Sequence, residues 1–135
     1  MRLFAILFAA FLALSTNPGL AKDPIGLGEI QLGSHVDSES RIPVPKSNFR
    51  SVEPIYISIE VTAPEELTGT NTVGVAWTYG ASKQPVYDGS RELEIGGVQT
   101  LQFHIEHPDG WPIGNYNAEI FINGQSRKIV QFSVR

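Results

Sequence analysis

The feature that most constrains this chain is a period-two alternation of apolar and polar residues, repeated in one segment after another. Alternation of this kind places one side of a β-strand in a core and the other side in water. No clean stretch after residue 21 carries the three-and-four spacing that an amphipathic helix requires. The alternating segments are residues 55–62, 73–79, 101–106, 116–122 and 130–134, and a further first strand is expected at 29–36.

Glycine, proline and asparagine separate these segments, which is typical of turns between antiparallel strands. Asn123-Gly124 stands between two alternating segments and predicts a two-residue hairpin, because both positions of a type I′ turn need positive φ. Residues 64–72 are expected to form a polar loop, and residues 38–50 a loop or an irregular sheet edge. Short strands with frequent turns predict seven or eight strands in an antiparallel sandwich or barrel.

The first 21 residues are expected to direct export and not to join the fold. Arg2 gives a positive start, residues 3–14 are an unbroken apolar run, and small residues precede Lys22 as a signal peptidase requires. A run of twelve residues makes a helix of about 18 Å, shorter than the roughly 30 Å hydrocarbon core of a bilayer. We therefore expect a signal peptide at 1–21, one domain at 22–135, and no integral membrane segment after cleavage.

Charge and cysteine content narrow the function classes. Removal of residues 1–21 takes away one basic group, Arg2, and changes the formal net charge from −4 to −5. A net negative chain repels phosphates, which argues against a nucleic-acid partner. With no cysteine there is no disulfide, thiol nucleophile or thiolate metal ligand, so the core alone must hold the domain. An exported domain without cysteine is typical of a bacterial periplasmic or secreted protein.

Two segments resemble immunoglobulin-like domains. Residues 113–118 resemble the Gly-X-Tyr-X-Cys segment that opens strand F, with alanine in the place of the cysteine. Trp77 looks like the buried tryptophan of strand C, and Ile57 or Ile59 would occupy the place of the strand B cysteine. The resemblance implies a structural role for Tyr116, whose hydroxyl would bond to the main chain at the corner before strand F.

A closer resemblance covers nearly the whole chain after residue 21. Residues 108–116 read Pro-Asp-Gly-Trp-Pro-Ile-Gly-Asn-Tyr and match a segment of immunoglobulin-like domains in bacterial exported proteins. In those domains Asn-Gly or Asp-Gly joins the last strand pair, which is the place of Asn123 and Gly124 here. The resemblance implies an all-β, immunoglobulin-like antiparallel β-sandwich of about seven or eight strands. It implies no catalytic residues, because a fold does not determine a function.

The three histidines do not predict a metal site. His104 and His107 are three positions apart, and on a strand an odd spacing places two side chains on opposite faces. His35 falls on the expected first strand without a second ligand beside it. We therefore predict no metal and no cofactor.

The acidic and hydroxyl residues do not predict catalysis either. Glu92 and Glu94 would share one strand face, and Glu65 and Glu66 fall in a loop. Glycoside hydrolysis needs two carboxylates facing each other across a cleft, which nothing in the pattern indicates. The chain has no Gly-X-Ser-X-Gly nucleophile elbow and no glycine loop that opens a helix. We predict no catalytic residues.

Three aromatic residues are the candidates for contact with a ligand or partner. Tyr79, Tyr87 and Trp111 are expected at strand ends or in turns, where rings can stack on sugars or anchor a protein. The favoured interpretation is that Trp111 caps the end of the sandwich and that the two tyrosines cover neighbouring strands. The leading hypothesis is a non-catalytic exported binding or scaffold module that uses a sheet edge or end loops to bind an unknown protein or an envelope glycan. A carbohydrate-binding module with exposed aromatic residues is the alternative, and a small secreted enzyme is the third.

Overall fold

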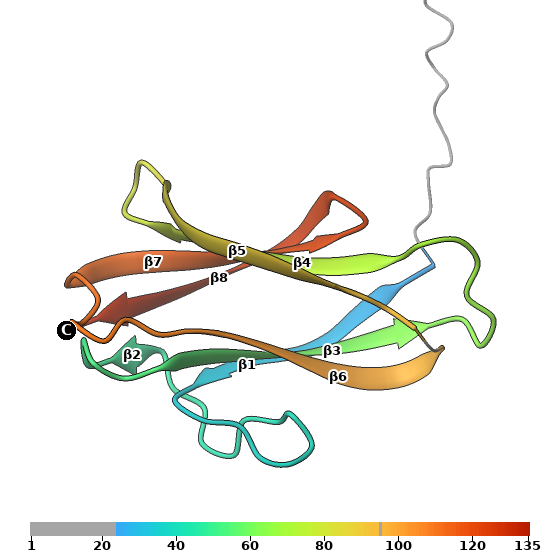
Figure 1. Ribbon diagram of the computed structural model, residues 1–135, viewed down its shortest axis with the longest axis horizontal. Coiled ribbons are helices and arrows are strands. Elements are labelled where there is room, and N and C mark those ends of the chain that lie inside the picture. Colours follow the sequence, from blue (N-terminus) through green and yellow to red (C-terminus); the bar gives the residue numbers. More distant parts are fainter. Residues whose placement is uncertain (1–23, 95) are drawn as a thin grey trace, which may run out of the picture.

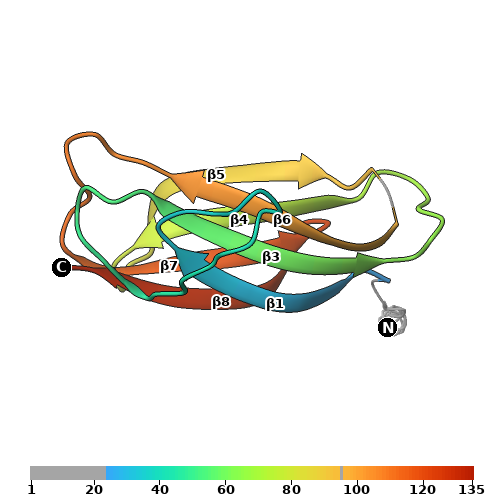
Figure 2. The ribbon, with the colours of Figure 1, turned by 90° about the horizontal axis from the view of Figure 1, so that it is seen from below.

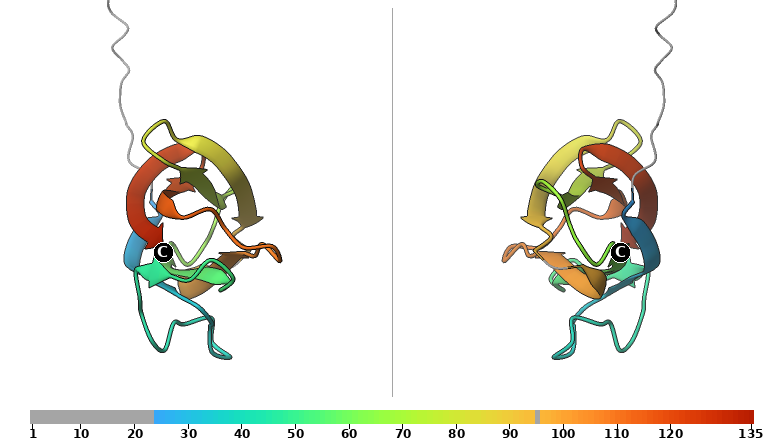
Figure 3. Two further views of the ribbon diagram at one scale, coloured as in Figure 1. Left: turned by 90° about the vertical axis from the view of Figure 1, so that its left-hand side faces the viewer. Right: turned by 90° about the vertical axis from the view of Figure 1, so that its right-hand side faces the viewer.

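Two packed β-sheets form the part of the chain that the computed structural model describes, residues 24–94 and 96–135 (Figure 1). The strands are β1 (Gly26–Gly33), β2 (Asn48–Phe49), β3 (Ile55–Ala63), β4 (Thr72–Tyr79), β5 (Gln84–Glu92), β6 (Gly97–Ile105), β7 (Gly114–Ile122) and β8 (Gln125–Val134). The smaller sheet has the order β1-β3-β6 and the larger has the order β2-β8-β7-β4-β5. End-on views show the two layers facing each other (Figure 3). The predicted all-β sandwich of about seven or eight strands is confirmed.

The described residues contain no helix, so none of them forms a helix long and apolar enough to cross a membrane. The expected signal peptide at 1–21 lies outside the described residues.

The apolar side of each alternating segment lies between the sheets. The core aromatic residues surround Phe132, whose ring stacks on Tyr116 at 5.3 Å and meets Trp77 edge-on at 5.9 Å. Phe49 of the short strand β2 contacts the same ring at 5.7 Å. The other buried apolar side chains are mainly from β3, β4 and β7: Ile55, Ile57, Ile59, Val61, Val73, Val75, Ala118, Ile120 and Ile122. Rings in edge-on and offset contacts add to the free energy gained from their burial.

The last two strands are joined by the two-residue hairpin that the sequence predicts. Asn123 has a φ of 51° and Gly124 a φ of 82°, and the flanking residues Ile122 and Gln125 are paired. Positive φ at both central positions gives a type I′ turn the twist of the strands that it joins. The Asn123 side chain also accepts a hydrogen bond from the Thr72 backbone N–H at 2.9 Å, which ties the hairpin to the start of β4.

The first strand and the 38–50 segment differ from expectation. β1 covers Gly26–Gly33 in place of 29–36, so His35 lies beyond its end. The pairing of β1 with β3 contains an irregularity between Leu27 and Ile30, and such a bulge displaces the alternation from which we predicted the strand. Within 38–50, Asn48–Phe49 forms β2 and pairs parallel with β8, so the larger sheet is not wholly antiparallel.

No strand was predicted at the place of β5. Most of its nine residues are exposed, and none is buried. Because most of its residues are exposed whichever way they point, β5 has no apolar alternation by which to be recognised.

The burial of Trp77 gives a stability prediction with a matched control. Trp77 is 1% exposed, and its neighbour across the β4–β5 pair, Tyr87, is 60% exposed. We expect Trp77→Ala to lower the free energy of unfolding by about 3 to 5 kcal/mol, through lost burial and the cavity that remains. Tyr87→Ala should change it by no more than about 0.5 kcal/mol. Chemical denaturation measures both, and a loss below about 1 kcal/mol for Trp77→Ala would contradict its place in the core.

Candidate functional site

The sandwich leaves four strands at sheet edges: β1, β6, β2 and β5. An edge strand presents backbone N–H and C=O groups that no neighbour satisfies, and most proteins protect such edges. Charged side chains, prolines, bulges and short length are the usual means of protection. An edge that has none of these features is open to another strand.

Three of the four edges are protected. β1 has the irregularity after Leu27, and the Glu60 carboxylate accepts a hydrogen bond from the Glu29 backbone N–H there, at 3.3 Å. β2 is only two residues long. β5 contains Pro85, Asp88, Arg91 and Glu92, and its pairing with β4 shifts between Trp77 and Thr78. Each of these features discourages the addition of another strand.

β6 has no such protection. It is nine residues long and contains no proline, aspartate, glutamate, lysine or arginine. Its pairing with β3 runs without a shift from Gly97 opposite Ala63 to Ile105 opposite Ile55. Among the described residues, no other strand pairs with β6, and no turn or loop backbone bonds to residues 100–105. Since successive residues of an antiparallel strand point their N–H and C=O groups to opposite sides, about half of these groups face outward.

A cleft of about 230 Å³ runs beside this free edge. Figure 2 shows β5 and β6, one from each sheet, alongside each other on one side of the sandwich. Gln102, Phe103 and His104 of β6 line the cleft in succession. Side chains of successive strand residues point to opposite faces. Three successive residues can therefore line the same cleft only along the backbone edge that they share. The cleft therefore exposes main chain.

Side chains of β5 form the opposite wall. Tyr87 and Arg91 point to the core side of the larger sheet, since they pair with the buried residues Trp77 and Val73. The Arg91 guanidinium lies 5.5 Å from the centroid of the Phe103 ring, across the cleft. Among the described residues, no carboxylate forms an ion pair with Arg91, so its positive charge is available to a ligand.

Of the three predicted contact residues, Tyr87 is the one in this cleft. We expected it at a strand end or in a turn, and that placement is wrong, because it is the fourth residue of the nine in β5. Its ring is nevertheless largely exposed. The unprotected β6 edge and Arg91 were not singled out from the sequence, although the lack of charge and proline in residues 97–105 was a readable signal.

Tyr79 and Trp111 lie together at one end of the sandwich, around Tyr116. The Tyr116 hydroxyl donates to the Pro112 carbonyl at 2.6 Å, which is the corner contact that the resemblance implied. The Tyr79 hydroxyl donates to the Ile113 carbonyl at 2.9 Å, and its ring lies 4.9 Å from that of Tyr116. Gly114 has a φ of 147°, and a Cβ there would lie 2.9 Å from the Tyr79 ring, so the corner needs a glycine.

Trp111 packs against the core beside this corner. Its indole ring is partly buried, 5.0 Å from the His107 ring and 6.4 Å from the Tyr116 ring, both edge-on. Its backbone N–H donates to the Ser51 carbonyl at 2.7 Å. Its indole nitrogen is buried and has no hydrogen-bond partner in the described part of the chain. This geometry is that of a cap on the end of the core.

The remaining polar candidates lie apart from one another. His104 stacks on Tyr56 on the outer face of the smaller sheet at 4.7 Å, whereas His107 lies in the loop beyond β6. Across residues 24–94 and 96–135, no three histidine, aspartate or glutamate side chains lie close enough to share a metal ion. Glu92 ends β5, and Glu65, Glu66 and Glu94 lie exposed outside the strands.

Comparison with known proteins gives structural matches only. No family model matches this chain, and no curated protein sequence is similar to it. The C-terminal domain of Wzt has a TM-score of 0.61 at 11% identity, with 84% of this chain and 75% of that domain's chain aligned. An immunoglobulin-like protein from Pseudomonas aeruginosa has a TM-score of 0.52 at 11% identity, with 85% of this chain and 99% of that chain aligned.

An alkylpurine DNA glycosylase from Pseudomonas fluorescens, bound to DNA with an abasic-site analogue, has a TM-score of 0.56 at 14% identity. The alignment covers 83% of this chain but only 30% of the glycosylase. At such low identities the likeness shows the fold alone. The fold is an immunoglobulin-like β-sandwich.

The corner tyrosine predicts a loss of stability in alkali. Burial, with a smaller contribution from Tyr79, raises the pKa of Tyr116 from 10.0 to about 12. The unfolded state therefore ionises first, so the stabilising effect of the neutral phenol is complete below pH 10 and is lost as the pH rises through 12. Tyr116→Phe should cost about 1 kcal/mol near neutral pH, from the lost hydrogen bond. It should also remove the most alkaline step of the phenolate absorbance titration, and persistence of that step would assign it to another tyrosine.

The separation of the histidines predicts that zinc does not stabilise the protein. His104 is held against Tyr56 and His107 against Trp111, so the two imidazoles cannot converge on one ion without breaking these contacts. Neither zinc nor EDTA should change the melting temperature measured by calorimetry. A rise that saturates at one zinc ion per chain would contradict this prediction, and His104→Ala and His107→Ala would then identify the ligands.

Proposed function

We propose that this chain is a non-catalytic binding module of the bacterial periplasm or medium, and that it binds an extended segment of a partner protein as an added strand on β6. The observation that supports this proposal most is that β6 alone among the four edges lacks any protection. Strand addition derives its affinity from main-chain hydrogen bonds and its specificity from pockets for alternate side chains. β6 offers main-chain groups for such hydrogen bonds, and the cleft beside it offers a pocket for side chains.

The cleft favours a single extended segment over a second folded domain. Tyr87 and Arg91 of β5 stand on the far side of the cleft from the β6 backbone. A lone strand needs only the spacing of about 4.8 Å from β6 and room for its side chains. The edge of another sheet would have to bring its own facing layer into the same space, where β5 already lies.

Charge and shape indicate which segments bind. Side chains on one face of the added strand would enter the cleft, above Trp77 and Phe103 and beside Arg91. An unpaired arginine next to aromatic rings favours an acidic residue with an apolar or aromatic neighbour two positions away. A side chain at Gly89 would lie in this cleft, because a Cβ there would be in ordinary contact with the Tyr87 ring at 3.6 Å and the Phe103 ring at 3.9 Å.

The polar groups elsewhere support a binding role over a catalytic one. Hydrogen bonding to the Lys46 ammonium holds the pKa of Glu53 below its usual value, and the Glu53 carboxylate also accepts from the Arg50 backbone N–H at 2.7 Å. Backbone N–H groups of Arg41 and Glu39 lower the pKa of Asp37 in the same way. The hydrogen bonds of these two carboxylates stabilise the loops to which they belong, so their role is structural.

Selected peptides test strand addition without altering the protein. Linear decapeptides displayed on phage are selected against the folded protein, and each binder is then synthesised with one backbone nitrogen methylated at a time. If the peptide adds to β6, methylation should weaken binding about tenfold at every second position and leave the positions between nearly unchanged. Fluorescence anisotropy measures each variant, and a profile without this period of two would contradict strand addition.

A pair of equally exposed valines tests the location in the native envelope. Val98 lies on β6 and is 67% exposed, and Val52 lies on a loop outside the strands and is 66% exposed. A photo-crosslinking residue at position 98 should capture a partner segment that the same residue at position 52 does not. Gly89→Leu, which fills the cleft, should abolish the capture. Equal capture from both positions, or a crosslink to a second copy of this chain, would contradict the proposal.

A further inference from the structure

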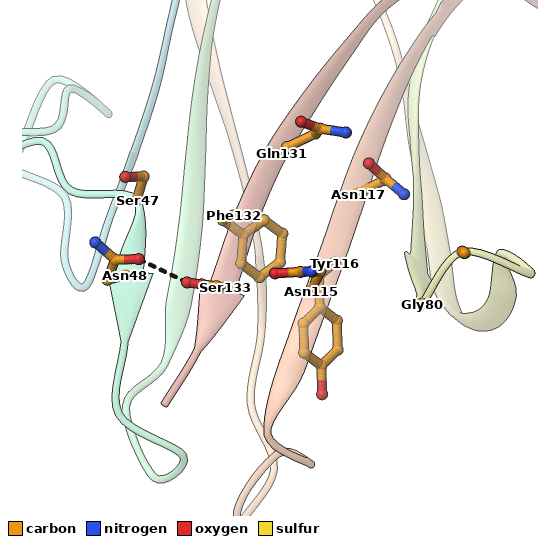
Figure 4. Close-up of a pocket in the computed structure, with 10 residues that line it drawn as sticks. Ser47, Asn48, Gly80, Asn115, Tyr116, Asn117, Gln131, Phe132 and Ser133 are labelled. Carbon is orange, nitrogen blue, oxygen red and sulfur yellow. Dashed lines mark hydrogen bonds between the residues drawn. The ribbon is translucent and has the colours of Figure 1, made fainter.

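A second hollow, on the outer face of the larger sheet, contains only uncharged residues (Figure 4). Its volume is about 440 Å³, and it lies over β8, β7, the segment that includes β2, and the turn after β4. The polar side chains in it are Ser47, Asn48, Asn115, Asn117, Gln131 and Ser133. No aspartate, glutamate, lysine, arginine or histidine lines it, although the chain as a whole carries a formal net charge of −4.

The strand register gathers four carboxamides in this hollow. Asn117 is opposite Gln131, and Asn115 is opposite Ser133, which is in turn opposite Asn48. Side chains directly opposite each other on one face of a sheet have Cβ atoms about 4.5 to 5.5 Å apart. Figure 4 shows the Asn117 and Gln131 amides side by side above the pair formed by Ser133 and Asn48.

The short parallel strand β2 supplies Asn48, the fourth of these carboxamides. The Ser133 backbone N–H donates to the Ser47 carbonyl at 3.0 Å, and the Ser133 hydroxyl donates to Asn48 Oδ1 at 2.6 Å. The Lys46 ammonium contacts the Glu53 carboxylate at 2.8 Å and fastens the segment that leads into β2. Asn48 is therefore held in place.

Most of the hydrogen-bonding capacity of these amides is unused. A carboxamide has two N–H donors and an oxygen that accepts. Asn115, Asn117 and Gln131 make no side-chain hydrogen bond to any other described residue, and Asn48 uses only its oxygen. The hollow thus presents many donors and acceptors, close together and without charge.

We infer that this hollow binds an uncharged oligosaccharide. Sugar hydroxyls both donate and accept hydrogen bonds, as carboxamides do. A neutral sugar carries no charge that would need an oppositely charged partner in the hollow. The volume is within the range of about 300 to 1,000 Å³ that is usual for small-molecule sites. An added peptide strand does not fit this surface, because the backbone groups of β7 and β8 are already paired within the sheet.

The hollow has no aromatic platform, which fixes the expected strength of binding. Tyr116 and Phe132 line it, but both are buried and stack on each other in the core. Neutral hydrogen bonds made in competition with water contribute little each, so we expect a dissociation constant on the order of 1 mM for one hexasaccharide. This site differs from one built on exposed aromatic rings, and it does not depend on the β6 edge.

NMR of the ¹⁵N-labelled protein tests the inference, since side-chain amide signals report directly on the hollow. The probes are maltohexaose, cellohexaose and mannohexaose, and a hexamer of polygalacturonate is the anionic counterpart. At least one neutral hexasaccharide should shift the side-chain amide signals of Asn115, Asn117 and Gln131. The polygalacturonate hexamer should bind at least about tenfold more weakly, because the net charge of the protein repels it.

Matched variants complete the test. Asn117→Ala and Gln131→Ala should each weaken sugar binding at least about fivefold. Gln125→Ala removes an exposed carboxamide from the hairpin at the far end of β8 and should change nothing. Thermal unfolding checks that all three variants fold. The inference is overturned if none of the three neutral sugars shifts these signals at tens of millimolar. It is also overturned if the shifts occur elsewhere, or if they depend on protein concentration without sugar, which would make the face a contact between copies.

Discussion

Apolar contact between the two sheets, without any covalent link, is the constraint on which the structure depends. Ala118 and both candidates for the strand B position, Ile57 and Ile59, stand where antibody domains that this chain resembles have their disulfide, and all three are fully buried. The contacts of Phe132 with Trp77, Tyr116 and Phe49 join β8, β4, β7 and β2 within the larger sheet. The fully buried side chains of β3 supply the smaller sheet's part of the same core. Because burial alone opposes the conformational entropy of the chain, each inner strand must keep its apolar side unbroken.

A sandwich has free sheet edges, which a closed barrel does not have. In this protein the edge strands differ in how well they are protected against the addition of another strand. The bulge at β1, the brevity of β2 and the proline and charges of β5 are each a known means of preventing strand addition. β6 has the longest pairing without a register shift of any edge strand here, and it has none of these means of protection. This contrast within one molecule is the reason for the proposal that a partner binds at the β6 edge.

The parts of the fold that the sequence predicted are those with strong local signals. Alternation in β3, β4 and β7 identified inner strands, and Asn123-Gly124 identified the hairpin. β5 was missed because its exposed residues leave no alternation, and the start of β1 was misplaced because a bulge shifts the period. The candidate sites depend on long-range register, which places Asn48 beside Ser133 and Arg91 beside Phe103. No local pattern contains that information.

The position of β5 beside the open edge has a consequence for stoichiometry. An unprotected edge is normally a template, since each strand that adds to it presents a new free edge to the next. Here a strand added to β6 enters the cleft whose opposite wall is β5, so its far side faces Tyr87 and Arg91 in place of solvent. Growth then ends after one strand. On the proposed mode of binding, the domain would therefore accept one strand and would not act as the seed of a fibre.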